Sequence, residues 1–358
     1  MSTPAALIKK ILGETATHSI RHFLNQLQEK WLILASQSKL TARLHYTLFS
    51  SAFDREMQGV LSGHVLHLEN RRSTEPVNYF LRRSIHRLEK GLIMRPYRPV
   101  FALSYINETV KAYRAGRIAG LNTAEIKWAH NVLSRYFQVT EAHPVIEQAR
   151  CAFIAIENAA EKKIVDCGYI PYQRNLSQPL PVTTEALAEL AWRRRSVRWY
   201  EQRPVTRSLI DQAIQIGALS PSACNRQPFE FRIFDDSDLV KKLVRLPGGA
   251  SGFDSNIPII AVLVGHLRAY PLPQDRHLIY IDGGLAAMSF IYGLETAGLS
   301  SCAINWPDIA EQETAMANML KLSKDERIIM LIAIGYPDPS GLVPNSKKIE
   351  LDQLRRYN

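Results

Sequence analysis

Residues 257–265 read Ile-Pro-Ile-Ile-Ala-Val-Leu-Val-Gly, and residues 328–335 read Ile-Ile-Met-Leu-Ile-Ala-Ile-Gly. Both runs have the length of a strand and are too short to cross a membrane. Their continuous apolar character is typical of strands that are buried on both faces. A third strand is expected at residues 229–234, where Phe and Ile alternate with other residues, and a fourth at residues 301–306. These four segments predict a sheet at the centre of the second half of the chain.

Helical patterns separate the expected strands. The first expected helix follows Pro204 and has an apolar stripe from Leu209 to Gly217. Three more helices are expected at Ser237–Leu246, Asp282–Ala297 and Asp308–Leu322. Strands that alternate with helices over about 170 residues indicate a layered domain of the α/β or α+β class.

The first half of the chain has a different pattern. Apolar residues recur there at steps of three and four, as in Ile20, Phe23, Leu24, Leu27, Trp31 and Leu34, and no strand alternation is found before about residue 170. Three prolines among polar residues mark a linker at 171–184. The sequence therefore predicts a helical, basic N-terminal domain (residues 1–170), the linker, and a second domain (residues 185–358).

The chain of 358 residues is 46% hydrophobic and carries 44 Lys and Arg against 34 Asp and Glu, a net charge of +10. Residues 1–190 hold 24 basic and 16 acidic side chains, a net of +8, against 20 and 18, a net of +2, in residues 191–358. This charge favours anionic partners, without choosing among nucleotides, acidic polymers and anionic membrane surfaces.

Several site classes are excluded by the motifs that are missing. The sequence has neither a phosphate-binding P-loop nor a GxGxxG dinucleotide fingerprint, and it has no zinc-hydrolase or deaminase signature. Its four cysteines lie far apart, so neither a disulfide framework nor a metal site is indicated. No nucleic-acid-binding signature is found, and we expect a cytoplasmic protein without a nucleic-acid partner.

Two polar segments remain as candidates for chemistry. Residues 193–198 read Arg-Arg-Arg-Ser-Val-Arg after an apolar helix, so their donors either converge on a phosphate or only complement the negative end of that helix. Residues 220–229 form a polar loop in which Ser222, Asn225 and Gln227 offer both donors and acceptors. That loop either reads the edge of a heteroaromatic ring or is a simple Pro/Ser/Asn turn.

These two segments, in this order, resemble the opening of the nitroreductase family of FMN-dependent oxidoreductases. Further similar segments follow in order: Gly298–Asn305 after a long helix, Leu322–Glu326 leading into Ile332–Pro337, and Ser346–Lys348. The resemblance covers about residues 185–358.

The resemblance implies an α+β sandwich with a central, mainly antiparallel sheet and a homodimer that binds FMN at its interface. Arg194 and Ser196 would hold the FMN phosphate, helped by Lys347 or Lys348, and Arg198 would lie near the flavin N1 and O2. Ser222 and Asn225 would come from the partner subunit, and the Asn305 N–H would meet N5. The implied cofactor-binding set is Arg194, Arg195, Ser196, Arg198, Ser222, Asn225, Gln227, Ala303, Ile304, Asn305, Lys347 and Lys348.

The implied activity is hydride transfer from NAD(P)H through FMN to a small-molecule acceptor, with no catalytic side chain and no metal. The chain departs from the family at Phe229, where Trp is usual, and at Trp306, which is expected to narrow the pocket or to stack near the ring.

Residues 71–98 hold eight Lys and Arg and two Glu, a net charge of +6. Their centre, residues 81–92, is similar to extensions of nitroreductase-like proteins from bacterial exopolysaccharide-biosynthesis loci. The charges either form a solvated helix face or bind an anionic polymer or membrane surface. The N-terminal domain is therefore expected either to roof an active flavin site or to serve in an accessory binding factor that keeps the flavin domain as a scaffold. A flavin oxidation or ring-opening reaction is a third reading.

Overall fold

The computed structural model describes residues 22–70, 77–119, 123–160, 163–165 and 167–358, in two units, Met1–Met57 and Gln58–Asn358. In the first unit a helix covers residues 22–36 and α2 covers Lys39–Leu48, with the Ser38 side chain accepting from Thr41 N. The helix expected over residues 20–34 is confirmed within the described residues, and Ile20 lies outside them. Most of its apolar side chains are exposed.

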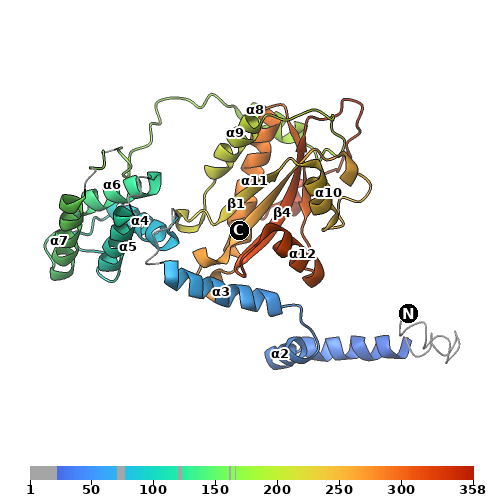
Figure 1. Cartoon of the computed structure of the whole chain (residues 1–358), viewed down its shortest axis with the longest axis horizontal. Coiled ribbons are helices and arrows are strands. Elements are labelled where there is room, and N and C mark those ends of the chain that lie inside the picture. Colours follow the sequence, from blue (N-terminus) through green and yellow to red (C-terminus); the bar gives the residue numbers. More distant parts are fainter. Residues whose placement is uncertain (1–21, 71–76, 120–122, 161–162, 166) are drawn as a thin grey trace. The chain divides into compact units, whose positions relative to one another are not determined.

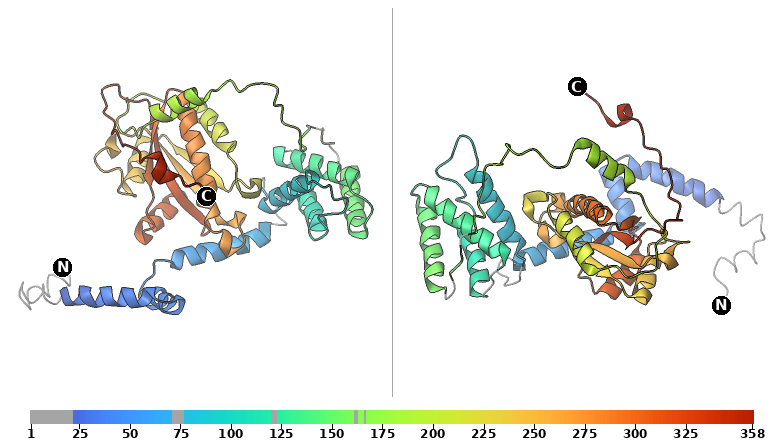
Figure 2. Two further views of the ribbon diagram at one scale, coloured as in Figure 1. Left: turned by 180° about the vertical axis from the view of Figure 1, so that it is seen from behind. Right: turned by 90° about the horizontal axis from the view of Figure 1, so that it is seen from above.

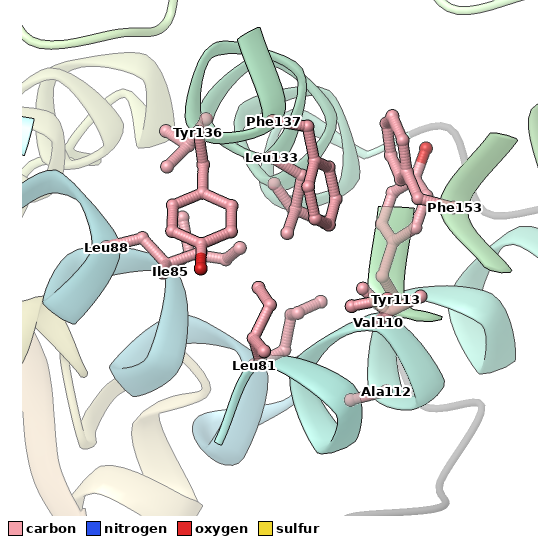
Figure 3. Close-up of a cluster of buried hydrophobic side chains, with 14 of the residues drawn as sticks. Leu81, Ile85, Leu88, Val110, Ala112, Tyr113, Leu133, Tyr136, Phe137 and Phe153 are labelled. Atoms are coloured by element: carbon pink, nitrogen blue, oxygen red, sulfur yellow. The ribbon is translucent and has the colours of Figure 1, made fainter. Parts of the chain in front are cut away.

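The second unit begins inside α3 (Asp54–Asn70) and continues through a group of four helices. These are α4 (Tyr79–Leu92), α5 (Ile106–Ile118), α6 (Ala124–Val139) and α7 (Pro144–Ala159). Their shared core includes the fully buried Leu133 and Tyr136, with Phe137 and Phe153 packed ring to ring (Figure 3). Within the described residues no strand precedes residue 229, as the sequence predicted.

A long connection follows α7. Between Ala159 and the start of α8 (Thr184–Arg193), the described residues form no helix or strand, and Figure 2 draws residues 167–183 as a trace without helix or strand. Residues 171–183 of the expected linker (171–184) therefore have the irregular backbone that its prolines favour, and Thr184 is already the first residue of α8.

The rest of the second unit is built around a four-stranded sheet in the order β1-β2-β4-β3. All three strand pairs are antiparallel, which confirms the α+β class. The elements are α9 (Arg207–Ala218), η1 (Ala223–Asn225), β1 (Phe229–Phe234), α10 (Ser237–Arg245), β2 (Ile259–His266), α11 (Leu278–Thr296), β3 (Ser300–Asn305), α12 (Ala310–Leu320), β4 (Glu326–Gly335) and α13 (Leu351–Leu354).

Helices cover both faces of this sheet. In β2, Ile260, Val262 and Val264 join one apolar core with residues of α10 and α12. The alternate residues of β2 join a second core with α9 and α11 on the opposite face. Figure 1 shows these two helical layers on either side of the strands. Strands buried on both faces explain the continuous apolar runs of the sequence.

One described helix, Pro273–Thr296, is long and apolar enough to span a membrane by length and composition alone. Half of it is buried inside the fold, where Phe290 and Leu294 belong to the core shared with α9. Packing in this core accounts for the apolar character of the helix.

A smaller apolar cluster joins the helical part of the second unit to the sheet. Tyr79 from α4 packs with Leu267, Ala269, Tyr270 and Ile279, which all come from the chain after β2. Next to it, α3 approaches at backbone level, because a Cβ on Gly63 would lie 2.8 Å from the carbonyl carbon of Leu267. The side chain of His67 donates to Arg268 O at 2.9 Å.

Candidate functional site

The arginine-rich turn leaves α8 and runs beside the edge strand β3. The N–H of Arg194 closes the helix on Leu190 O at 3.0 Å, and the next residues are extended. Ser196 then pairs with Ser301 in a parallel bridge, and Val197 N donates to Ser301 O at 3.1 Å. Two segments that the resemblance assigned to one cofactor are therefore adjacent in the fold.

Arg194 carries an unmet hydrogen-bond donor in this turn. Its Nε is buried and has no partner among the described residues. A buried N–H without an acceptor costs about 1–3 kcal/mol, so such a group marks a position where an external acceptor fits. A phosphate suits a guanidinium because it can accept two parallel hydrogen bonds. The turn thus passes a test for an FMN phosphate site.

The other side chains of the turn point in different directions. Arg198 donates to Ser196 O at 3.3 Å and lies 5.6 Å from the centre of the Phe253 ring. Arg195 instead stacks over Trp192 at 4.3 Å and donates to Arg194 O, which places it against the end of α8. Among the four polar residues expected here, Arg195 has the contacts of a helix-end residue.

The edge strand β3 presents alternating faces. Cys302 and Ile304 are buried in a core, whereas Ala303 and Asn305 are exposed. Burial raises the pKa of the Cys302 thiol, whereas the charge of Arg198 and a hydrogen bond with Ser196 lower it. The Cys302 side chain therefore lies close to both residues of the arginine-rich turn. The exposed face of β3 is open to a ligand that reaches across from the arginine-rich turn.

The interpretation of Trp306 as a pocket residue is wrong. Its side chain is buried in the core shared with α10 and α12, and its indole N–H donates to Glu313. Successive side chains of a strand point to opposite faces of the sheet. Trp306 therefore lies on the same face as Cys302 and Ile304 and not on the exposed face.

The polar loop at residues 222–227 is not joined to the arginine-rich turn. Gln227 N donates to the Ser222 hydroxyl and Gln227 Nε2 to Asn225 Oδ1, both at 3.0 Å, so the three predicted side chains do meet. Cys224, Asn225 and Gln227 all have φ between 51° and 55°, a left-handed backbone that non-glycine residues adopt at a cost. In the described residues no hydrogen bond or ion pair links this loop to residues 194–198.

The loop is held in its strained conformation by the helical part of the same unit. Arg82 Nε of α4 donates to Asn225 O at 3.1 Å, and Arg82 also pairs with Glu125 of α6 at 3.0 Å. From the other side, Ala223 N donates to the carboxylate of Asp282 at 3.2 Å. The sequence reasoning missed these contacts, because Arg82 and Asn225 lie 143 residues apart.

Arg226 is a further residue of this loop that the sequence reasoning passed over. It is only 4% exposed and its guanidinium lies over the Tyr270 ring at 4.5 Å. Burial lowers the pKa of the nearby Arg83 on α4, and the cations Arg226 and Arg87 lower it further. The basic residues of α4 are thus partly turned into the fold, and Arg71 and Arg72 lie outside the described residues.

Lys347 and Lys348 are both exposed, and Lys347 pairs with Glu350 at 3.2 Å. Their segment starts beside the arginine-rich turn, since Asp338 N donates to Trp199 O at 3.0 Å. Contact of these lysines with a phosphate stays a prediction. The described residues contain no group of three or more His, Cys, Asp or Glu that could hold a metal.

Comparisons with known proteins match this half of the chain. The nitroreductase family model matches residues 191–249 and 248–336. Iodotyrosine deiodinase 1 of Rattus norvegicus is 19% identical over 211 residues, which cover 51% of this chain and 73% of that protein. An Archaeoglobus fulgidus protein, provisionally named NADH dehydrogenase/NAD(P)H nitroreductase, is 23% identical over 174 residues, covering 48% of this chain and 98% of that protein.

Among solved structures, an FMN-dependent nitroreductase from Clostridium difficile R20291 has 22% identity and a TM-score of 0.41, covering 47% of this chain and 98% of that one. The sheet, its two helical layers and the sequence matches define an α+β oxidoreductase domain. Residues 191–336 of this chain belong to the nitroreductase family.

Proposed function

We propose that this protein is an FMN-dependent NAD(P)H oxidoreductase that reduces a small-molecule acceptor. The observation that carries this proposal is the buried, unpartnered Nε of Arg194, in a turn paired with the exposed edge strand β3. Arg194 and Ser196 would hold the phosphate of FMN, and the fixed positive charge of Arg198 would favour the reduced, anionic flavin. When bound, FMN supplies two-electron chemistry between the nicotinamide and the acceptor.

We further propose that the protein works as a homodimer. Apolar side chains stay exposed along α11, on the neighbouring α8 and α9, and directly after α9; they are Tyr280, Ile281, Leu285, Leu187, Trp192, Ile216 and Leu219. Because α8 and α9 both pack against α11, these exposed apolar side chains favour a protein–protein interface on this set of helices. We propose that a twofold partner on this face contributes its own loop at 222–227 to the turn at 194–198, because no hydrogen bond or ion pair joins these two segments within the described residues of one chain.

Reduction of one acceptor molecule by two electrons consumes one NAD(P)H. A nitro compound would be reduced as R–NO₂ + NAD(P)H + H⁺ → R–NO + NAD(P)⁺ + H₂O. The relatives named iodotyrosine deiodinase support a second acceptor class, an aryl halide, reduced as Ar–I + NAD(P)H → Ar–H + NAD(P)⁺ + I⁻. Assays with 4-nitrobenzamide and 3-iodotyrosine would decide between the two classes.

The visible spectrum of the purified protein tests the proposal directly. We expect a flavin spectrum after purification or after addition of FMN, and loss of the yellow absorbance on anaerobic addition of NADH or NADPH. A protein that stays colourless with added FMN would contradict flavin binding. A flavin that NADH and NADPH both leave oxidised would favour an accessory binding role, including the expected link to exopolysaccharide biosynthesis.

A further inference from the structure

A cavity of about 850 Å³ lies in the helical part of the second unit, and no residue of the predicted flavin site lines it. It is formed by the end of α4, the residues that follow it, α6, and the connection at residues 171–173. The lining residues that matter here are Leu92, Met94, Arg95, Tyr97, Arg135 and Tyr172. Its volume falls in the range of small-molecule sites, roughly 300–1,000 Å³.

The charged side chains of this cavity are cations. Arg95 and Arg135 both line it, and neither has a hydrogen bond or an ion pair within the part of the chain that the structure describes. No Asp or Glu contributes to the wall. Two guanidinium groups from different elements, without a carboxylate between them, suit a ligand with more than one negative charge.

Apart from Gln173, the remaining wall of the cavity is aromatic and apolar. Tyr97 is fixed to α6 because its hydroxyl donates to Val139 O at 2.6 Å, and the Tyr172 side chain on the opposite connection is 85% exposed. Leu92, Met94 and Val139 add an apolar surface. Tyrosine rings and apolar side chains bind the faces of a planar ring, whereas a bare inorganic anion would gain nothing from them.

We propose that this cavity binds a nucleotide, that is, a small molecule that carries both a planar ring and phosphate groups. Arg95 and Arg135 hold the phosphates, and Tyr97 and Tyr172 contact the base or the sugar. The site is separate from the proposed flavin site, and it gives the helical half a ligand of its own. A nucleotide bound here bridges α4 and α6 to the connection that leads into the oxidoreductase domain.

Isothermal titration of the full-length protein, purified without added flavin, tests this proposal with ADP, UDP, pyrophosphate and uridine as probes. We expect ADP or UDP to bind at least tenfold more tightly than pyrophosphate and uridine. Arg135→Gln and Arg95→Gln should each raise the nucleotide Kd about tenfold or more, because each removes a charge-assisted contact. Arg114→Gln, an exposed arginine on α5, is the matched control and should change nothing.

Each alternative has its own result. Equal affinity for pyrophosphate would reduce the cavity to a patch of positive charge and overturn the nucleotide proposal. Absence of ADP and UDP binding, or binding that neither cavity variant weakens, would also overturn it. Nucleotide binding lost in Arg194→Glu but kept in Arg135→Gln would assign the ligand to the flavin site instead. Failure of FMN binding, by contrast, would leave the cavity result untouched.

Discussion

Replacing Arg194 by Met should have opposite effects on cofactor affinity and on the stability of the protein without cofactor. The substitution keeps much of the apolar stem and removes the guanidinium with its buried, unpartnered Nε. The neighbouring Arg193 gives a matched control for cofactor binding, because its side chain is 72% exposed and pairs with Glu295 of α11 at 3.2 Å.

The magnitude follows from the contacts that Arg194 has and lacks. A charge-assisted hydrogen bond to a phosphate contributes about 1.5–3 kcal/mol, which corresponds to an FMN affinity roughly 10–150-fold weaker in Arg194→Met. Without FMN, the same substitution removes a buried donor that has no acceptor. The free energy of unfolding of the cofactor-free protein should therefore stay constant or rise by about 1 kcal/mol.

Flavin fluorescence quenching measures the FMN affinity, and urea unfolding of the cofactor-free protein measures the stability. We expect weaker FMN binding for Arg194→Met only, with the FMN affinity of Arg193→Met close to that of the unmodified protein. An unchanged FMN affinity in Arg194→Met would refute the phosphate site. Lower stability of the cofactor-free Arg194→Met protein would show that the Nε has a partner inside the fold.

Three further outcomes are expected. Gly91→Ala should lower the free energy of unfolding by about 1–3 kcal/mol, since its new Cβ would lie 2.1 Å from the Phe101 ring; a thermal melt with an unchanged Tm would contradict this packing. Asp325→Asn should lower the free energy of unfolding by about 1.5–3 kcal/mol at pH 7, because Arg268 loses its contacts with that carboxylate at 2.7 and 2.8 Å and keeps Glu326, at 3.4 Å, as its ion-pair partner. Burial acts to raise the pKa of Asp325, but hydrogen bonds with Arg268 and Ser323 outweigh it and hold that pKa below its usual value. The stabilisation by this carboxylate is therefore present above about pH 4 and is lost as the pH falls through the folded-state pKa; a deficit that persists in full at pH 2 would argue against the ion pair. Ile281→Asp should shift the protein from dimer to monomer in light scattering and release FMN, whereas a dimer that survives this change would move the interface elsewhere.

The sheet domain was predictable because its signals are local. The strand at Phe229–Phe234 has the predicted bounds, and Glu326–Gly335 contains the whole apolar run of residues 328–335, since alternation and apolar runs are properties of neighbouring residues. Helix α11 begins at Leu278 rather than at Asp282, the expected first residue. Residues Leu278–Ile281 are mostly apolar and extend the helical pattern toward the N-terminus of Asp282.

The candidate site was predictable only where a motif names its residues. The turn at Arg194 was found from its sequence, but the anchoring of Asn225 by Arg82 depends on tertiary packing of distant segments. The same holds for the ion pair between Arg82 and Glu125, whose side chains are largely buried although Arg82 belongs to a basic helix face for which exposure to solvent was one expectation. Long-range partners leave no periodic signal in a single chain.

The close approach of α3 has a practical consequence for anyone dividing this protein. Gly59, Gly63 and His67 recur every fourth residue on one side of α3, and each meets the segment around Leu267 and Arg268. A fragment that starts at residue 185 would lack α3 and α4, and the apolar side chains of Leu267, Tyr270 and Ile279 that now pack against them would be exposed to solvent. The piece that recombinant work should keep intact therefore begins near residue 54, well ahead of the boundary that the proline-rich stretch suggests.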